Sequence, residues 1–237
     1  MEPAGGNDFP QTPSTGRIPL PHENTVIFKL KRPLCLASGS PRRIDFFKSL
    51  DIPVVAHTPP EGAEPIPLTG EAPIAFAERA ALAKAHSVAS LLLEARDNAE
   101  SSRLPLVIAA DTIVVLRENI LGKPRNADDA FAMLSALSGN SHKVITGCAL
   151  LFPDTFRART FAVSSNVVMW DCPPELLRSY AYSGEPLDKA GAYAVQGAGA
   201  FLIKSLHGSW SNVVGLPLAE LVQELLGMGV LLPAQPA

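Results

Sequence analysis

LCLASGSPRRIDFFKSL, residues 34–50, is the stretch that decides the fold. Its first four residues form a short apolar run, which predicts a buried strand. Ser38, Gly39 and Ser40 follow as a turn. Pro41 suits the first position of a helix, because its missing N–H would be unpaired there anyway. We therefore expect a strand, a tight turn with Ser40 as the helix N-cap, and an amphipathic helix.

Two arginines occupy the first turn of this predicted helix. The helix dipole already places partial positive charge there, and a capping box would put Glu or Gln at the position of Arg43. Arg42 and Arg43 therefore indicate a bound anion. Guanidinium groups, free backbone N–H groups and the hydroxyls of Ser38 and Ser40 all suit phosphate. The alternative is two solvated arginines on an ordinary helix.

Composition excludes several classes of protein. The chain has 237 residues, 47% of them hydrophobic and 18% charged, so it can bury a sizeable core. A net charge of −3 argues against a broad nucleic-acid footprint, and we expect no stable nucleic-acid partner. No apolar run approaches the roughly 20 residues that a membrane span needs, so no membrane is expected. The three cysteines show neither zinc spacing nor a disulfide framework, which fits a reducing, cytoplasmic setting.

The chain divides into an extension and one domain. Residues 1–28, rich in Pro, Gly, Ser and Thr, are predicted to be a disordered extension, without the apolar core of a signal peptide. Residues 29–237 are predicted to form one α/β domain, in which early strands alternate with helices and a β-rich section follows. The polar segment 97–103 interrupts this pattern as an insertion.

An aspartate interrupts the most apolar segment of the chain. Residues 106–116 read LVIAADTIVVL, which is typical of a strand buried on both faces. A buried carboxylate without partners is costly, so Asp111 should meet a cation or metal, or lie at a strand end that faces a cleft. The alternative is a turn aspartate between two shorter strands.

The remaining elements are predicted from periodicity and end signals. We expect a loop over 57–73 that carries Glu64, and a long helix over 74–96. Asn126 should cap another helix, and residues 142–152 and 160–170 should pair as antiparallel strands. A closing helix is expected over 217–226.

The isolated charged residues suggest one kind of chemistry. Four cations could hold a polyphosphate, and two carboxylates could hold Mg²⁺ or Mn²⁺, which takes few protein ligands beside phosphate oxygens and water. The cations are Arg42, Lys84, Lys123 and Lys189, and the acids are Glu64 and Asp111. Surface lysines are the alternative for Lys84 and Lys189 taken singly. No P-loop motif is present, and the glycine-rich segment 184–199 is not a dinucleotide fingerprint.

Several motifs together resemble the Maf (septum formation) family of nucleoside triphosphate pyrophosphatases. In order, they are SGSPRR at 38–43, an Arg79 to Lys84-Ala85 segment, ADT at 110–112, GKP at 122–124, KAG…QG at 189–197 and SNVVGLP at 211–217. The match runs over about residues 34–226. KAGAYAVQG at 189–197 is similar to the subgroup that acts on dTTP and UTP, and differs from the subgroup that acts on 7-methyl-GTP.

The resemblance implies a fold and an activity. It implies an elongated mixed β-sheet flanked by helices, like that of inosine triphosphate pyrophosphatase, and a homodimer. It also implies metal-assisted hydrolysis of a nucleoside triphosphate to the monophosphate and pyrophosphate, with Mg²⁺ or Mn²⁺ as cofactor.

The resemblance further implies roles for individual residues. Asp111 would be the proton acceptor and a metal ligand with Glu64. Arg42, Lys84 and Lys123 would bind phosphates. Arg42, Thr112 and Gln196 would influence base choice, and the amide of Gln196 can pair with the O and N–H edge of a pyrimidine. The predicted substrate-binding residues are Ser38, Ser40, Arg42, Arg43, Lys84, Thr112, Lys123, Lys189 and Gln196.

Two departures from the family pattern leave alternatives open. The family commonly has Asp-Glu where residues 63–64 read Ala-Glu, so Glu61 is an alternative metal ligand to Glu64. KAGA at 189–192 has Ala where Gly is usual. Two other functions also remain: a nucleotide-binding regulator of cell division without turnover, and a 7-methyl-GTP pyrophosphatase of the same fold.

Overall fold

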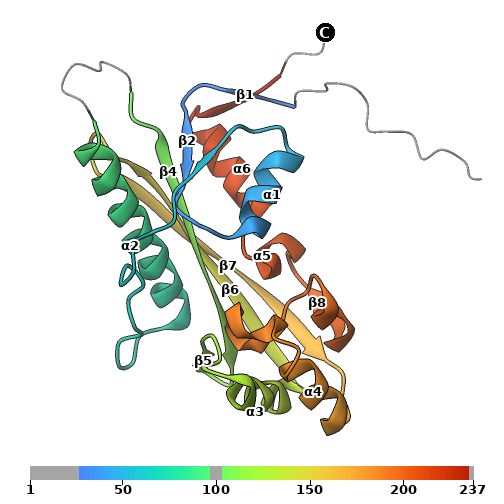
Figure 1. Cartoon of the computed structure of the whole chain (residues 1–237). Coiled ribbons are helices and arrows are strands. Elements are labelled where there is room, and N and C mark those ends of the chain that lie inside the picture. The colour runs from blue at the N-terminus through green and yellow to red at the C-terminus, as the bar shows by residue number, and fades with distance from the viewer. Residues whose placement is uncertain (1–26, 97–102, 235–237) are drawn as a thin grey trace, which may run out of the picture.

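One mixed sheet forms the long axis of the molecule (Figure 1). The structure is a computed structural model that describes residues 27–96 and 103–234. Among these residues, the main sheet has seven strands in the order β3-β2-β4-β6-β7-β8, and β5 pairs with β4 outside this path. The strands of this sheet are β2 (Leu34–Leu36), β3 (Val55–Ala56), β4 (Leu106–Leu116), β5 (Asn119–Leu121), β6 (Ser141–Phe152), β7 (Arg157–Met169) and β8 (Ile203–His207).

The sheet confirms the predicted mixed α/β class. Strand β2 runs parallel to β3 and β4, whereas β4, β6, β7 and β8 are antiparallel neighbours. A separate antiparallel pair joins the two ends of the described chain, β1 (Phe28–Leu30) and β9 (Leu231–Pro233). Residues 1–26 of the predicted extension and most of the predicted insertion, residues 97–102, lie outside the described residues, while Phe28 already belongs to β1.

Helices cover both faces of the sheet (Figure 1). Helix α2 packs on one face, against alternate residues of β2, β4 and β6. On the other face, α1 and α6 cover one end and α3 and α4 cover the other end. The helices are α1 (Pro41–Ser49), α2 (Pro73–Glu94), α3 (Ala127–Leu137), α4 (Pro174–Ala181), α5 (Trp210–Val214) and α6 (Leu218–Gly227). Three 3₁₀ turns lie between α4 and β8: η1 (Glu185–Asp188), η2 (Ala190–Ala192) and η3 (Ala198–Leu202).

A glycine lets α2 approach the sheet closely. Gly147 on β6 lies opposite Asp111 of β4. A Cβ atom at Gly147 would come within 2.2 Å of the backbone of Ala77, so no larger residue fits without moving the helix. Ala77 and Lys84 are two turns apart and therefore share one helix face. The same close packing that seats α2 thus carries Lys84 toward β4.

Most predicted elements are confirmed, and the exceptions have physical reasons. The strand 106–116 has the predicted bounds, and the side chain of Asn126 caps α3 by accepting from the Asp129 N–H. The turn alternative for Asp111 is wrong, because β4 is continuous through it. Ser40 is the N-cap residue of α1, but its side chain makes no capping bond. Instead, the hydroxyl of Ser38 accepts from the Ser40 N–H.

Candidate active site

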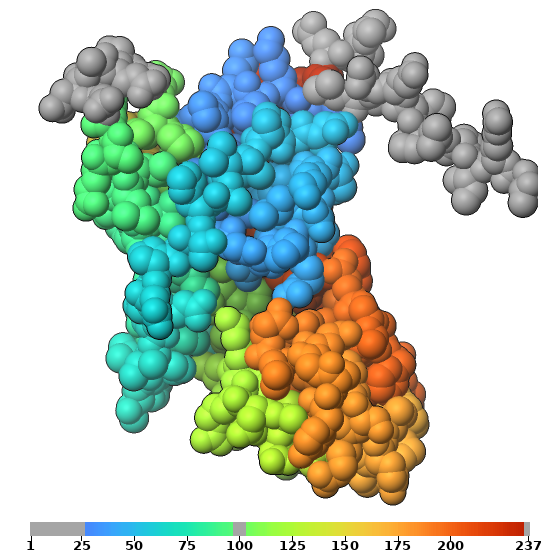
Figure 2. All heavy atoms as spheres, viewed as in Figure 1, coloured from blue at the N-terminus to red at the C-terminus, as the bar shows by residue number. Residues whose placement is uncertain are grey.

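A cleft of about 940 Å³ opens beside the middle of β4. On that edge, β4 pairs with β2 over Leu106–Ile108 and with β5 over Val114–Leu116, and the stretch between these pairings lies open. Asp111 is at the centre of this stretch. Figure 2 shows the surface hollowed between the cyan residues of the α2 region, the blue residues of α1 and the orange 3₁₀ segment. Segments distant in the sequence therefore meet at a break in the sheet edge.

All the sequence-predicted site residues line this one cleft. They come from both sides of β4, from α1 and α2, and from four loop segments. The residues are Ser38, Ser40, Arg42, Arg43, Glu64, Lys84, Asp111, Thr112, Lys123, Lys189 and Gln196. Since the sheet alternation sends Asp111 toward α2 and Thr112 toward α1, the cleft wraps around the strand edge and reaches both faces.

Lys84 lies between two carboxylates; together, Glu64, Lys84 and Asp111 form the Lys84 cluster. Its Nζ atom is 2.5 Å from Asp111 Oδ1 and 2.8 Å from Glu64 Oε1. The side chains of Lys84 and Asp111 are only 8% and 15% exposed, so water weakens their attraction little. The hydrogen bond from Lys84 is the largest influence on Glu64, and the pKa of that carboxyl lies below its ordinary value. Glu64 is thereby held in the anionic form that can bind a cation.

The two arginines of α1 have different environments. Arg43 donates from Nε to the carbonyl of Gly215 at 2.7 Å, and its terminal nitrogens donate to Ser38 Oγ and Thr112 Oγ1, each at 3.2 Å. Thr112 also shares a hydrogen bond of 2.9 Å with the hydroxyl of Thr146. Arg43 therefore ties the turn after β2 to β4 and to the segment that follows α5.

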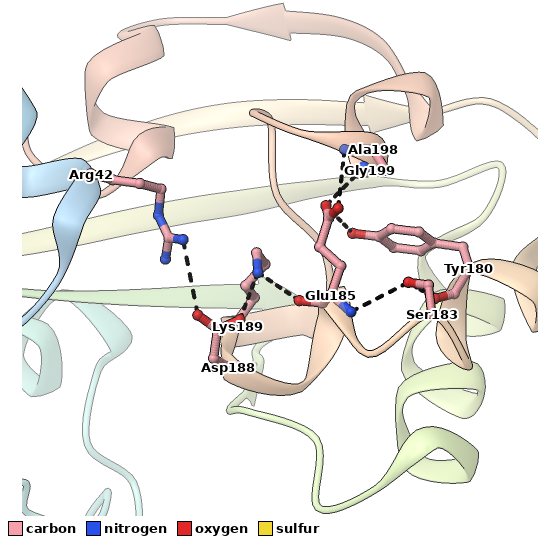
Figure 3. A network of polar contacts seen from close by, with 8 residues as sticks. All are labelled: Arg42, Tyr180, Ser183, Glu185, Asp188, Lys189, Ala198 and Gly199. Atoms are coloured by element: carbon pink, nitrogen blue, oxygen red, sulfur yellow. Dashed lines mark hydrogen bonds and ion pairs between the residues drawn. The ribbon is translucent and has the colours of Figure 1, made fainter.

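Arg42 instead faces the 3₁₀ segment; with Asp188 and Lys189 it forms the Arg42 cluster (Figure 3). Its NH1 atom is 4.0 Å from Asp188 Oδ2, and Asp188 also accepts from Lys189 Nζ at 2.6 Å. Lys189 additionally donates to the main-chain carbonyl of Glu185 at 2.6 Å. Two cations thus point at one exposed carboxylate across the cleft mouth.

Glu64 and Asp111 are the cleft residues whose chemistry fits a divalent cation. Glu64 and Asp111 each place an oxygen on the same Nζ atom, so the two carboxylates converge on one position that holds a positive charge. Glu61 also lines the cleft, but the contact with Lys84 belongs to Glu64. Among the described residues, no three His, Cys, Asp or Glu side chains gather to hold a metal. Two carboxylates completed by phosphate oxygens and water are a pattern typical of Mg²⁺.

The geometry agrees with comparisons to known proteins. A family model described as Maf-like protein matches residues 33–228. The chain belongs to the Maf family. Two proteins named dTTP/UTP pyrophosphatase resemble this Maf chain over most of their length. The one from Nitratidesulfovibrio vulgaris is 48% identical over 208 residues, covering 88% of this chain and 93% of the relative. The one from Myxococcus xanthus is 45% identical, covering 84% and 94%.

One alanine near Lys189 has a conformational cost. Ala192 is buried and adopts a φ of +61°, in the left-handed region that glycine enters without strain. Ala192 therefore strains the backbone near Lys189 by about 1 kcal/mol.

Two acids beside the predicted site residues, Glu185 and Asp188, were not predicted from the sequence, and Asp188 lines the cleft. Asp188 pairs with both Arg42 and Lys189, and Glu185 holds the backbone nearby. The sequence feature that could have indicated Asp188 is its place next to Lys189 inside a glycine-rich segment.

No helix in the described residues is long and apolar enough to cross a bilayer.

Proposed function

We propose that this Maf protein hydrolyses dTTP and UTP to the nucleoside monophosphate and pyrophosphate. The observation that carries the proposal is the convergence of Glu64 and Asp111 on Lys84 in a cleft that Arg42 and Lys123 also line. A cleft with carboxylates at one place and cations along its walls suits a metal-bound polyphosphate. The relatives named dTTP/UTP pyrophosphatase support the choice of these two nucleotides.

The reaction is a displacement at the α-phosphorus. A water oxygen attacks this phosphorus, the bond to the bridging oxygen of the β-phosphate breaks, and pyrophosphate leaves with the bond electrons. Asp111 accepts the proton of the water, which is the work of a positioned general base. Arg42, Lys84 and Lys123 stabilise the negative charge that builds on the phosphates.

Glu64 and Asp111 would hold the divalent cation. When bound, Mg²⁺ or Mn²⁺ supplies charge neutralisation and lowers the pKa of a coordinated water. Arg43 acts mainly by orientation in this proposal, because three of its N–H groups already bind Ser38, Thr112 and Gly215. Gln196 lines the same cleft and offers the donor and acceptor that a uracil or thymine edge needs.

Pyrophosphate release from a panel of nucleotides tests the proposal. With Mg²⁺ or Mn²⁺ present, dTTP and UTP should be the best substrates among the pyrimidine and purine triphosphates and 7-methyl-GTP. A protein inert toward every pyrimidine triphosphate contradicts the proposal. A preference for 7-methyl-GTP favours the other pyrophosphatase, and tight nucleotide binding without release favours the division regulator.

Two further features belong to this proposal. We place the reaction in the cytoplasm, which is supported by the three cysteines, all free thiols in the described residues. We also expect a homodimer. Cell fractionation and analytical ultracentrifugation test these two expectations independently of the substrate panel.

A further inference from the structure

Glu185 holds the loop that carries Gln196 (Figure 3). Its carboxylate oxygens accept from the backbone N–H groups of Ala198 and Gly199 at 3.1 and 3.0 Å. The hydroxyl of Tyr180 donates to the same carboxylate at 3.1 Å. Three donors thus converge on one carboxylate, and two of them are backbone groups two and three residues beyond Gln196.

The backbone between Gln196 and these contacts has an unusual conformation. Gly197 adopts φ +87° and ψ −157°, a region that is essentially restricted to glycine. A Cβ at Gly199 would come within 2.3 Å of the Tyr180 hydroxyl, so the tyrosine packs directly on the loop. Such a conformation persists only when its surroundings fix it, and Glu185 supplies the bonds that do so.

The charge of Glu185 matters for these bonds. Burial alone would raise its pKa, but the N–H groups of Gly199 and Ala198 and the Tyr180 hydroxyl outweigh it, and the pKa lies below its ordinary value. The side chain is therefore an anion at neutral pH. Hydrogen bonds to an ionised acceptor are about twice as strong as those between neutral groups.

Glu185 reaches a second site residue through its main chain. Its carbonyl oxygen accepts from Lys189 Nζ at 2.6 Å, and this bond does not depend on the carboxylate. One residue therefore touches both the loop that presents Gln196 and the lysine on the phosphate side of the cleft. The two sets of hydrogen bonds can be tested separately. A substitution of the Glu185 side chain removes the bonds to the loop but leaves the main-chain bond from Lys189.

We propose that Glu185 is a positioning residue for base selection, whose carboxylate holds Gln196 at the depth where its amide meets a uracil or thymine edge. This inference rests on the proposed function. A glutamine amide can turn over and serve cytosine as well, so its selectivity depends on where the backbone places it. Loosening the loop therefore weakens the choice between bases more than it weakens phosphate binding.

The test uses Glu185→Gln in the full chain. The amide has nearly the same shape but loses one acceptor oxygen and turns N–H donors toward the loop amides. We expect the ratio of kcat/KM for UTP to that for CTP to fall about tenfold. Inhibition by inorganic tripolyphosphate, which has no base, should change by less than about twofold, because the bond from Lys189 remains.

Two further variants keep the test decisive. Tyr180→Phe removes one of the three donors and should lower the same ratio by about two- to threefold. Glu224→Gln is a matched control outside the cleft, since Glu224 pairs with Arg159 on the surface, and its ratio should equal that of the wild type. A Glu185→Gln protein that loses activity equally toward UTP and CTP overturns the inference. If the wild type hydrolyses no pyrimidine triphosphate, the proposed function itself is wrong.

Discussion

The Lys84 cluster and the Arg42 cluster are opposite in charge, and they differ in how far their ion pairs are exposed. In the Lys84 cluster one cation lies between two carboxylates, and in the Arg42 cluster one carboxylate lies between two cations. The pair of Lys84 and Asp111 is 8% and 15% exposed, whereas Arg42 and Asp188 are 34% and 68% exposed. The third member of each cluster is the reverse, since Glu64 is 60% exposed and Lys189 is 12% exposed. The first cluster therefore has an excess of negative charge around a buried ion pair, and the second an excess of positive charge around a solvated one.

This difference predicts the orientation in which a metal-bound polyphosphate lies in the cleft. A divalent cation is drawn to the carboxylates, and phosphate oxygens are drawn to the arginine and lysine. The pair of Lys84 and Asp111 lies on α2 and β4, which are regular and well packed, so its geometry is suited to the chemical step, and Glu64 reaches it from the loop before α2. The exposed cluster joins α1 to 3₁₀ turns, a setting suited to capturing and releasing substrate. We expect substitutions in the two clusters to have different consequences.

The largest effect should come from Asp111→Asn. The amide retains the size of the side chain but accepts no proton at neutral pH and binds metal weakly. We expect kcat for dTTP to fall by about 10³-fold, measured by pyrophosphate release. Asp45→Asn is the control, since Asp45 pairs only with Lys48 on the exposed side of α1. A variant that retains a tenth of the activity contradicts the role of Asp111.

In the Arg42 cluster, substrate binding should depend on the shape of the cationic side chain as well as on its charge. Arg42→Lys preserves the positive charge but loses the two-pronged hydrogen bonding of the guanidinium. We expect kcat/KM to fall by about tenfold, mostly through a higher KM. Arg125→Lys, in the surface pair with Asp129, should leave steady-state kinetics unchanged. Unaltered kinetics of Arg42→Lys would count against a direct contact with phosphate.

Substitutions in the two clusters should also differ in their effect on the free energy of unfolding. Lys84→Met leaves Asp111 and Glu64 without their shared cation, and we expect the free energy of unfolding to fall by about 3 kcal/mol. Arg42→Met breaks a longer, solvated contact and should cost less than about 1 kcal/mol. Urea denaturation of both variants measures the difference. Equal losses would mean that burial does not distinguish the two clusters.

The smallest predicted effect is a pH dependence in the Lys84 cluster. The pKa of Glu64 is lowered from its ordinary value of 4.5, so the folded protein binds this proton less readily than the unfolded chain does. The contribution of Glu64 to stability is therefore fully present above about pH 4.5, and is lost as the pH falls through the lowered pKa. Wild type and Glu64→Gln should converge in thermal stability on acidification. A difference in thermal stability between the two proteins that does not change with pH would contradict the pairing of Glu64 with Lys84.

The sequence predicted the regular part of this fold well because its signals are local. The run at 106–116 and the cap at Asn126 each depend on neighbouring residues, and both were confirmed. The short elements β5, β9 and α5 went unpredicted, since three to five residues carry too little periodicity. Ser40 is the N-cap residue as predicted, but its side chain makes no capping bond, and its own N–H donates to the hydroxyl of Ser38.

For the candidate site, the order of residues along the chain establishes which side chains are available. How these side chains are used depends on the folded arrangement. Adjacent in the chain, Arg42 and Arg43 look equivalent, yet one faces the cleft mouth and the other binds Ser38, Thr112 and Gly215. Lys84 and Asp111 are 27 positions apart and meet only because Gly147 lets α2 settle on the sheet. Contacts of this kind depend on long-range packing, which no local pattern of residues encodes.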